Sequence, residues 1–275
     1  MKVQEIHANR FFAEVGEDFY TDIKADNLPD IVDDDLPKTW NGGFRTIEIT
    51  GEDVRHIRDV LRMKAGDSLV VCDGRGNDWL CRIAEIKKTG VLTEVLGRRQ
   101  SSGEPPVEVV LYQGMPRGDK FDLVVQKCVE VGVSRIVPMI CERTQFGAEL
   151  LKKANKTDRW RRIALEAAKQ SGRGKVPKIA DVVTLENAVR LLPEGAFVII
   201  PYEKERERTL KSTLREHPEA KNCHIFIGPE GGFSEREIAG AIEAGAMPVT
   251  LGPRILRTET AGIVVIATVL YELDH

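Results

Sequence analysis

The chain has 275 residues, of which 42% are hydrophobic and 30% are charged, and its formal net charge is −3. This length accommodates one large domain or two ordinary ones, and no hydrophobic run approaches the ~20 residues that a membrane-spanning helix needs. The N-terminus lacks the hydrophobic segment of a signal peptide, so we expect a soluble, globular, cytoplasmic protein without a membrane partner.

The N-terminal part of the chain contains short runs with the composition of β-strands. These runs cover residues 45–50, 68–72, 78–86 and 91–96. Asp73-Gly-Arg-Gly-Asn77 lies between two of them and predicts a hairpin turn. Several short strands joined by turns favour a small β-barrel of ~100 residues. The acidic segment 20–43 interrupts this pattern, and we interpret it as an inserted loop.

A domain boundary is expected at Ser101-Ser-Gly-Glu-Pro-Pro106, because glycine and consecutive prolines interrupt both helices and strands. We therefore divide the chain into a first domain, residues 1–103, and a second domain, residues 104–275. Strands and helices alternate in the second domain. The expected elements are the strands 107–112, 133–140 and 196–200 and the helices 119–131 and 159–171, before two further strand–loop units. Such alternation is typical of an α/β fold whose parallel sheet is covered on both faces.

Charge is distributed unevenly along the chain. Residues 14–35 contain nine acidic residues and a single lysine, whereas residues 152–178 contain ten basic residues and two acidic ones. The basic stretch predicts contacts with RNA phosphates. A solvated helix face is the alternative explanation for the same run.

The cysteines and histidines indicate neither a disulfide framework nor a metal site. The five cysteines are odd in number and show no C-x-x-C spacing, and the five histidines are scattered. We therefore expect reduced, mostly buried thiols and no bound metal.

Two glycine-containing loops near the C-terminus are the most informative feature of the chain. Phe226-Ile-Gly-Pro-Glu-Gly-Gly232 and Leu251-Gly-Pro253 each follow or end an apolar strand. Ser234 and Glu237 form an S-x-x-E capping box, which predicts a helix that begins directly after the serine and stops at Gly245. Glycine loops at the carboxyl ends of adjacent parallel strands form a ligand crevice. A tight turn before a helix explains the first loop equally well.

These loops, and segments spread over most of the chain, resemble the RsmE family of knotted SPOUT-type methyltransferases, which methylate N3 of a uridine in 16S ribosomal RNA. The matching segments are Arg10-Phe-Phe12, residues 56–67, residues 127–138, Arg159-Trp160, Glu166-Ala167, Gln170-Ser-Gly-Arg173 and the two loops. The most specific match is Arg257-Thr-Glu-Thr-Ala261. Related ribose 2′-O methyltransferases share the glycine loop but usually carry Ser-Leu-Asn-Val in place of Thr-Glu-Thr-Ala.

The resemblance implies a PUA-like RNA-binding β-barrel followed by a SPOUT domain, which is an α/β parallel-sheet domain with a trefoil knot. It also implies S-adenosyl-L-methionine as the cofactor, held mostly by the backbone of loops. The residues expected to contact it are Ile200, Pro201, Ile227, Gly228, Gly232, Leu251, Gly252, Ile255 and Leu256. The glycines admit the cofactor where a Cβ would obstruct it. We expect that some of these aliphatic side chains serve only the core.

The partners implied by the resemblance are 16S ribosomal RNA in the small ribosomal subunit and a second copy of the chain. The residues expected to bind RNA are Arg10, Arg58, Arg62, Arg159, Arg161, Arg162 and Arg173. The last helix, residues 260–273, is apolar nearly all round and therefore needs burial on more than one side. We expect it to pair in a homodimer, although a plain core helix would have the same composition.

Methylation of uracil N3 requires that this nitrogen lose its proton and that the base be unpaired. The catalytic candidates are Arg257, Glu259 and Glu230. A cation such as Arg257 can stabilise the developing uracil anion, and either carboxylate can accept the proton. Glu259 could equally be a structural partner of Arg257 or a cap on the last helix.

Two other functions are compatible with the sequence. One is a ribose 2′-O RNA methyltransferase of the same fold, and the other is a non-catalytic RNA-binding factor in ribosome assembly. Intact glycine loops and Arg257-Thr-Glu-Thr260 argue against the second, because a protein without the cofactor has little use for them.

Overall fold

The computed structural model describes residues 9–13, 15, 45–145 and 154–273. The chain divides into two compact units, Met1–Glu104 with Ser171–Val176, and Pro105–Gln170 with Pro177–His275. The acidic segment 20–43 and the first two lysines of the basic stretch lie outside the described residues.

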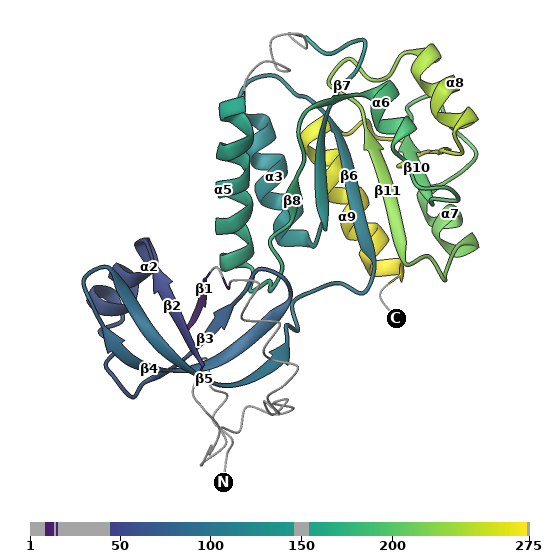
Figure 1. Ribbon diagram of the computed structural model, residues 1–275. Helices are drawn as coiled ribbons and strands as arrows, with labels where there is room; N and C mark the ends of the chain where they lie inside the picture. The colour runs from purple at the N-terminus through teal and green to yellow at the C-terminus, as the bar shows by residue number, and fades with distance from the viewer. Residues whose placement is uncertain (1–8, 14, 16–44, 146–153, 274–275) are drawn as a thin grey trace. The chain divides into compact units, whose positions relative to one another are not determined.

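The first unit is built on a five-stranded sheet (Figure 1). Its elements are β1 (Arg10–Phe12), β2 (Thr46–Thr50), α2 (Glu52–Arg55), the π-helical turn η1 (His56–Val60), β3 (Ser68–Cys72), β4 (Asn77–Ile86) and β5 (Gly90–Gln100). The strand order is β1-β3-β4-β5-β2, with β1 parallel to β3 and the other neighbours antiparallel. The β-rich first domain is confirmed, and β5 extends further than its apolar run predicted.

One aspartate explains the turn between β3 and β4. The Asp73 carboxylate accepts hydrogen bonds from two backbone N–H groups of the turn, at 2.7 and 3.1 Å. It also accepts from the indole N–H of Trp79, the largest fully buried side chain of this unit. Side-chain acceptance of turn N–H groups is the reason that aspartate favours turns. The hairpin predicted from Asp73-Gly-Arg-Gly-Asn77 is therefore confirmed.

The second unit is a parallel sheet with the order β12-β10-β11-β6-β7-β8, and β9 pairs with β7. Its strands are β6 (Glu108–Gly114), β7 (Arg135–Ile140), β8 (Lys178–Ile179), β9 (Val183–Thr184), β10 (Val198–Pro201), β11 (Asn222–Ile227) and β12 (Met247–Val249). Its helices are α3 (Lys120–Val131), α5 (Ala154–Gln170), α6 (Leu185–Arg190), α7 (Leu210–Glu216), α8 (Glu235–Glu243) and α9 (Thr258–Leu273). The α/β parallel-sheet class is confirmed.

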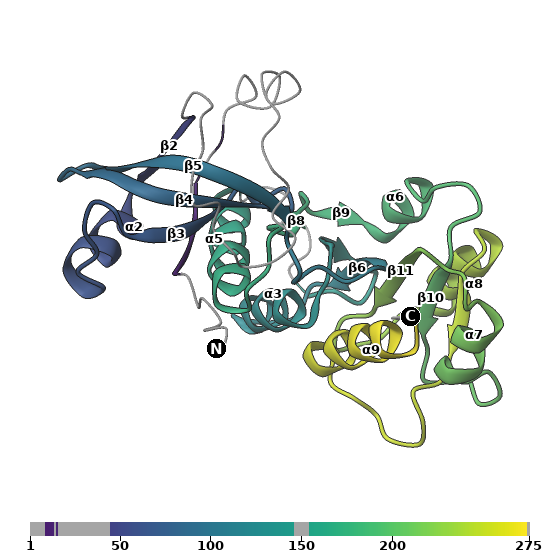
Figure 2. The same ribbon diagram turned by 90° about the horizontal axis from the view of Figure 1, so that it is seen from below.

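Helices cover both faces of this sheet because its strands place apolar side chains on both faces. Val110 and Tyr112 of β6 share a core with residues of α6 and α8. Leu111, between them, lies against Gly262 of α9. α9 packs on β6 and β11 and lies beside α3, as both views show (Figure 1 and Figure 2). α9 is therefore a central element of the second unit.

The five cysteines are free and buried, as predicted. Burial raises the pKa of Cys81 and of Cys128 to about 12, so these thiols stay protonated at neutral pH. Within the described residues, no helix combines the length and the apolar character needed to cross a bilayer. In the same part of the chain, no group of three or more His, Cys, Asp or Glu side chains could hold a metal ion.

Candidate functional site

Three loops meet at the carboxyl edge of the parallel sheet. They follow β10, β11 and β12, which are neighbours because β10 pairs with both of the others. Together with the start of α9 these loops enclose a cleft of about 640 Å³. Clefts of ~300–1,000 Å³ at this edge of an α/β sheet are the usual place for a small-molecule ligand.

Most residues predicted to contact a cofactor line this cleft. They are Pro201, Ile227, Gly228, Gly232, Leu251, Gly252, Ile255 and Leu256. Ile200 does not line it, because β10 buries this side chain completely in the core below, and we reassign it as a core residue. Ile255 lines the cleft and is 77% exposed, so its aliphatic side chain is accessible to a ligand.

Backbone geometry requires the glycines of the cleft. Gly252 has a φ of 101°, which residues with side chains rarely adopt, and open space where a Cβ would stand. A Cβ on Gly228 would lie 3.3 Å from the ring of Phe233. Gly114, at the end of β6, is packed more closely still, because a Cβ there would lie 2.5 Å from the backbone nitrogen of Pro229. The backbone of the glycine loop therefore packs directly against the end of β6 at Gly114.

The predicted capping box holds the helix that follows the glycine loop. Ser234 Oγ accepts from Glu237 N at 3.2 Å, and Glu237 Oε2 accepts from Ser234 N at 2.8 Å. The other oxygen of Glu237 accepts from Glu142 N at 2.7 Å, in the loop after β7. Arg143, next in that loop, donates to the carbonyl of Gly231 at 3.0 Å. The loop after β7 thus stabilises the glycine loop.

A hydrogen-bond chain joins the glycine loop to α9. Thr258 Oγ1 donates to the Gly228 carbonyl at 2.5 Å and accepts from Gln113 Nε2 at 2.8 Å. Gln113 and Thr258 are both buried, and Gln113 also donates to the Gly114 carbonyl at 3.1 Å. Thr258 therefore connects the two walls of the cleft directly.

Two of the three catalytic candidates, Arg257 and Glu230, line the cleft; Arg257 is exposed, and the side chain of Glu230 is 29% exposed. Glu230 Oε1 accepts from Arg117 N at 3.0 Å and lies 3.5 Å from Lys120 Nζ. Burial raises the pKa of the Glu230 carboxyl. Hydrogen bonds from the Arg117 amide and from its own amide, together with the Lys120 cation, lower this pKa by more than burial raises it. The net pKa lies below the ordinary value, so Glu230 is ionised at neutral pH and is a weak base.

Glu259 is placed differently from the other two candidates. It lies in the first turn of α9, does not line the cleft, and its side chain is 14% exposed. Its Oε1 lies 3.2 Å from Lys120 Nζ, and its Oε2 is buried without a hydrogen-bond partner among the described residues. These contacts favour a structural role for Glu259, with Lys120 as its partner in place of Arg257.

Two of the arginines predicted to bind RNA have internal partners in the first unit. The Arg173 side chain is 3% exposed, and its guanidinium donates to the Glu104 carboxylate at 2.8 Å. Arg10 donates to Asp78 at 2.5 Å and also to the carbonyl of Gly172. Both side chains stabilise the segment that follows α5, so we remove them from the predicted RNA-binding set.

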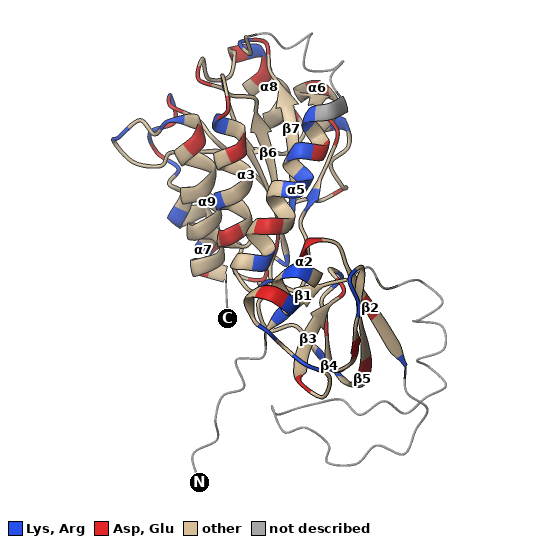
Figure 3. Ribbon diagram, turned by 90° about the vertical axis from the view of Figure 1, so that its left-hand side faces the viewer, with Lys and Arg blue, Asp and Glu red and all other residues tan. Residues whose placement is uncertain are grey.

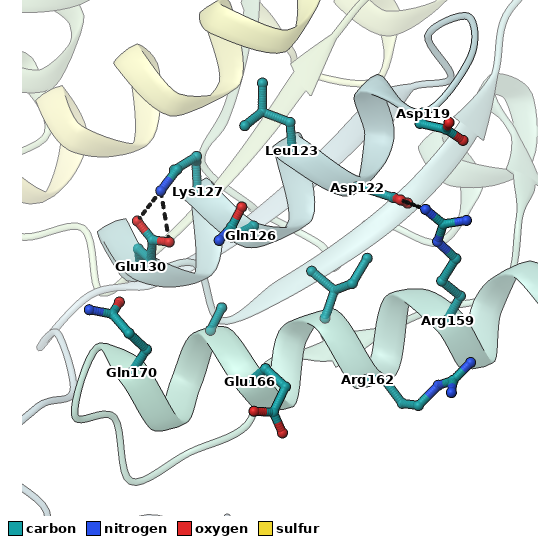
Figure 4. A pocket seen from close by; sticks show the side chains of 12 residues that line it. Asp119, Asp122, Leu123, Gln126, Lys127, Glu130, Arg159, Arg162, Glu166 and Gln170 are labelled. Atoms are coloured by element: carbon teal, nitrogen blue, oxygen red, sulfur yellow. Dashed lines mark hydrogen bonds and ion pairs between the residues drawn. The ribbon is translucent and has the colours of Figure 1, made fainter.

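The basic residues of α5 divide between two surroundings. Figure 3 shows basic and acidic residues interspersed along this helix. Arg159 and Arg162 line a groove of about 1050 Å³ between α3 and α5 (Figure 4). Arg159 pairs there with Asp122 of α3, whereas Arg162 has no ion-pair partner among the described residues. Arg161 lies outside the groove and pairs with Asp158 at 3.0 Å and with Asp181 at 3.7 Å. The structure thus brings two of the three arginines together.

Arg58 belongs to the helical turn η1 of the first unit, and Arg62 lies just after it. Arg58 makes two hydrogen bonds to Asp59, at 2.7 and 2.9 Å, with part of its side chain exposed. Arg62 is exposed and has a φ of 54°, which makes it the one non-glycine residue with positive φ in the described part of the chain. Both remain predicted RNA contacts.

Four residues that support the cleft were not singled out from the sequence. Thr258 lies inside the most specific motif, so its position carried a signal. Gln113 and Gly114 were marked only by a polar residue and a glycine at the end of an apolar strand. Nothing in the sequence connects Lys120 with Glu230, because the two residues meet only through the fold.

Comparisons with known proteins agree with this geometry. Residues 103–270 match the model of an RNA methyltransferase domain, and residues 49–96 match that of an RNA methyltransferase PUA domain. The chain is 31% identical over 233 residues to ribosomal RNA small subunit methyltransferase E of Bacillus subtilis (strain 168), which covers 83% of this chain and 91% of that protein. The protein of the same name from Buchnera aphidicola subsp. Acyrthosiphon pisum is 31% identical over 247 residues, with 90% and 94% covered.

A solved structure is similar over nearly the whole chain. It is the crystal structure of a ribosomal RNA small subunit methyltransferase E from Neisseria gonorrhoeae bound to S-adenosyl methionine. The TM-score is 0.75 at 30% sequence identity, and the match covers 95% of this chain and 96% of that one.

Proposed function

The chain belongs to the ribosomal RNA small subunit methyltransferase E family, and we propose that it methylates N3 of a uridine in 16S ribosomal RNA with S-adenosylmethionine as the methyl donor. The observation that supports this most is the cleft where both glycine loops, Arg257 and the start of α9 meet. Bound there, S-adenosylmethionine supplies an electrophilic methyl group. We place the reaction on the small ribosomal subunit in the cytoplasm, where free buried thiols are usual.

The residues of the cleft fit this cofactor. The aliphatic side chains of Ile227, Leu251, Ile255 and Leu256 offer apolar walls for a planar base, and the loops present backbone donors and acceptors. The open space at Gly252 lets a ligand approach the backbone directly. Mostly apolar walls with a few polar groups are typical of sites for cofactors of this size.

Arg257 is the residue to which we assign stabilisation of the uracil anion. It directly precedes α9, lines the cleft and is exposed, so its guanidinium is available to a base presented there. A cation favours the anion over neutral uracil, which lowers a barrier instead of only tightening binding. Of the two carboxylates, Glu230 is the better candidate for the proton acceptor, because it lines the cleft and Glu259 does not.

The N3 edge of uracil is occupied in a base pair, so the target must be unpaired or flipped out of its stack. We assign phosphate contacts to Arg159 and Arg162 at the groove of the second unit, to Arg161 beside it, and to Arg58 and Arg62 in the first unit. The match of residues 49–96 to an RNA methyltransferase PUA domain supports a role for the first unit in RNA binding.

We also propose a homodimer formed through α9. Val264, Ala267 and Tyr271 make an exposed, largely apolar stripe on this helix, and Tyr271 is 85% exposed. Leu123, on the neighbouring helix α3, is 44% exposed. A helix that is buried on one side and apolar on the other is expected to pack against a second partner.

Light scattering tests the dimer. Tyr271→Asp should give a monomer at micromolar concentration, because it introduces a charge into the paired surface. The control is Leu191→Asp, which alters a leucine that is 70% exposed at the end of α6 and lies outside the stripe. A monomeric wild-type protein, or a Tyr271→Asp variant that stays dimeric, would refute this interface.

The role of Arg257 is tested by separating binding from turnover. We expect Arg257→Ala to keep its affinity for S-adenosylmethionine within a few fold and to lose about a hundredfold or more in turnover. Arg257→Lys should be intermediate, and higher pH should partly rescue Arg257→Ala because free uracil then ionises without help. Normal turnover of Arg257→Ala would contradict the assignment. A defect confined to cofactor binding would make Arg257 a cofactor-binding residue and leave Glu230 as the catalytic candidate.

A further inference from the structure

Lys120 occupies a position between the two walls of the cofactor cleft. It is the first residue of α3, and its side chain is 37% exposed. Its ammonium group lies 3.5 Å from Glu230 Oε1, in the glycine loop, and 3.2 Å from Glu259 Oε1, in the first turn of α9. One cation therefore contacts one carboxylate on each side of the cleft.

This pair of ionic contacts connects the same two segments as the hydrogen bond from Thr258 to the Gly228 carbonyl. Thr258 and Glu259 are adjacent in α9, and Gly228 and Glu230 belong to the same loop. The two walls are thus joined twice, once by a partly buried hydrogen bond and once by a partly exposed ion pair. α3 supplies the second connection although none of its residues lines the cleft.

We infer that Lys120 is a positioning residue for cofactor binding: by holding Glu230 and Glu259 at once, it fixes the glycine loop and the start of α9 at the spacing that the cofactor requires. This inference rests on the cofactor cleft proposed above. Without the cation, two carboxylates remain close together, and their repulsion acts to separate the walls. Glu259 would also become a mostly buried carboxylate that lacks its counter-charge, which is strongly unfavourable.

The expected effect is on cofactor affinity and not on the chemical step. An interaction that sets the spacing of a binding site contributes equally before and in the transition state, so its loss raises KM. The Lys120 cation also lowers the pKa of the Glu230 carboxyl, so its removal makes Glu230 a stronger base and should not lower kcat. The pair is intermediate between an exposed ion pair, which contributes little, and a buried one, which contributes much. We therefore expect Lys120→Met to raise the dissociation constant for S-adenosylmethionine about tenfold.

The experiment measures binding of S-adenosylmethionine by calorimetry and steady-state methylation of small ribosomal subunits, with Lys120→Met, Lys120→Arg, Glu259→Gln and the double variant Lys120→Met/Glu259→Gln. Lys120→Arg preserves the charge and should stay within about threefold of wild type. Because Lys120 acts through Glu259, the double variant should bind no worse than about twofold beyond Lys120→Met alone. Arg190→Met is the control, since it removes an exposed ion pair with Glu186, 2.6 Å long, in the same unit and outside the cleft.

Three results would overturn the inference. They are a wild-type affinity in Lys120→Met, a loss in kcat with unchanged KM, and a double variant whose defect is the product of the two single defects. If Lys120→Met does not fold, Lys120→Arg and Glu259→Gln decide the question, because rescue by arginine and a defect in Glu259→Gln are both required. Gly252→Val is measured in parallel. Wild-type affinity in that variant would refute the cleft itself, whereas wild-type affinity in the Lys120 variants alone would refute only the positioning role.

Discussion

Replacement of Thr258 by valine removes one hydroxyl group and leaves the shape of the side chain almost unchanged. In the native protein this hydroxyl donates to the Gly228 carbonyl at 2.5 Å and accepts from Gln113 Nε2 at 2.8 Å. Without it, the carbonyl of the glycine loop loses its donor and the buried amide of Gln113 loses an acceptor. The glycine loop then lacks its direct hydrogen bond to α9.

The size of the effect follows from what stays satisfied. Gln113 keeps its hydrogen bond to the Gly114 carbonyl at 3.1 Å, and Gly228 is only partly buried. A buried polar group that loses its partner costs about 1–3 kcal/mol, and we take about 2 kcal/mol for this site. For a protein of this size, that loss lowers Tm by roughly 4–8 °C. Affinity for S-adenosylmethionine should fall as well, because the loop must be ordered again on binding.

Differential scanning calorimetry and titration with S-adenosylmethionine measure both effects. Thr268→Val is the matched control on the same helix, because within the described part of the chain Thr268 Oγ1 donates only to the Val264 carbonyl, at 2.8 Å within α9. That substitution should change stability by no more than about 0.5 kcal/mol. If Thr258→Val melts with the control and binds the cofactor as wild type does, the hydrogen-bond chain does not hold the loop.

Two further predictions concern the cleft and the RNA-contacting surface. Gly252→Val should abolish binding of S-adenosylmethionine and keep a wild-type circular dichroism spectrum. The control Gly245→Val introduces a side chain at a glycine of similar φ outside the cleft and should bind normally. Equal affinities in the two variants would refute the cofactor assignment. Arg159→Ala/Arg162→Ala should lower the slope of log affinity for RNA against log salt by ~0.7–0.9 for each lost phosphate contact. Arg161→Ala should lower it by one such step, because Arg161 is also assigned a phosphate contact. An unaltered slope in the double variant would leave only a solvated helix face.

Local patterns predicted the parts of the site that depend on neighbouring residues. The capping box of Ser234 and Glu237 gave the start of α8, and Gly245, with a φ of 93°, follows its end. The two glycine loops lie together because parallel strands end at the same edge of a sheet. A trefoil knot depends on how the chain threads through itself, which no periodicity in the sequence indicates. The prediction of a knot therefore rests on the family resemblance.

Contacts between residues far apart in the sequence could not be predicted in this way. Arg173 belongs to a basic run and was expected to contact RNA. It is buried instead against Glu104, the last residue of the first segment of the same unit. The partner of Glu259 is Lys120 and not the neighbouring Arg257. Charge runs indicate an average surface, whereas burial and pairing of a single arginine or glutamate depend on which distant carboxylate or ammonium group the fold places beside it.

The position of the transferred methyl group tests the central claim most directly. Wild-type protein is incubated with small ribosomal subunits or naked 16S ribosomal RNA and with S-adenosylmethionine that carries a deuterated methyl group, and the digested RNA is examined by mass spectrometry. We predict that the label is found on N3 of a uracil base, and that Gly252→Val transfers none. Label on a ribose 2′-oxygen would identify a ribose methyltransferase, and the absence of label from both substrates with wild-type protein would contradict the proposed enzymatic function.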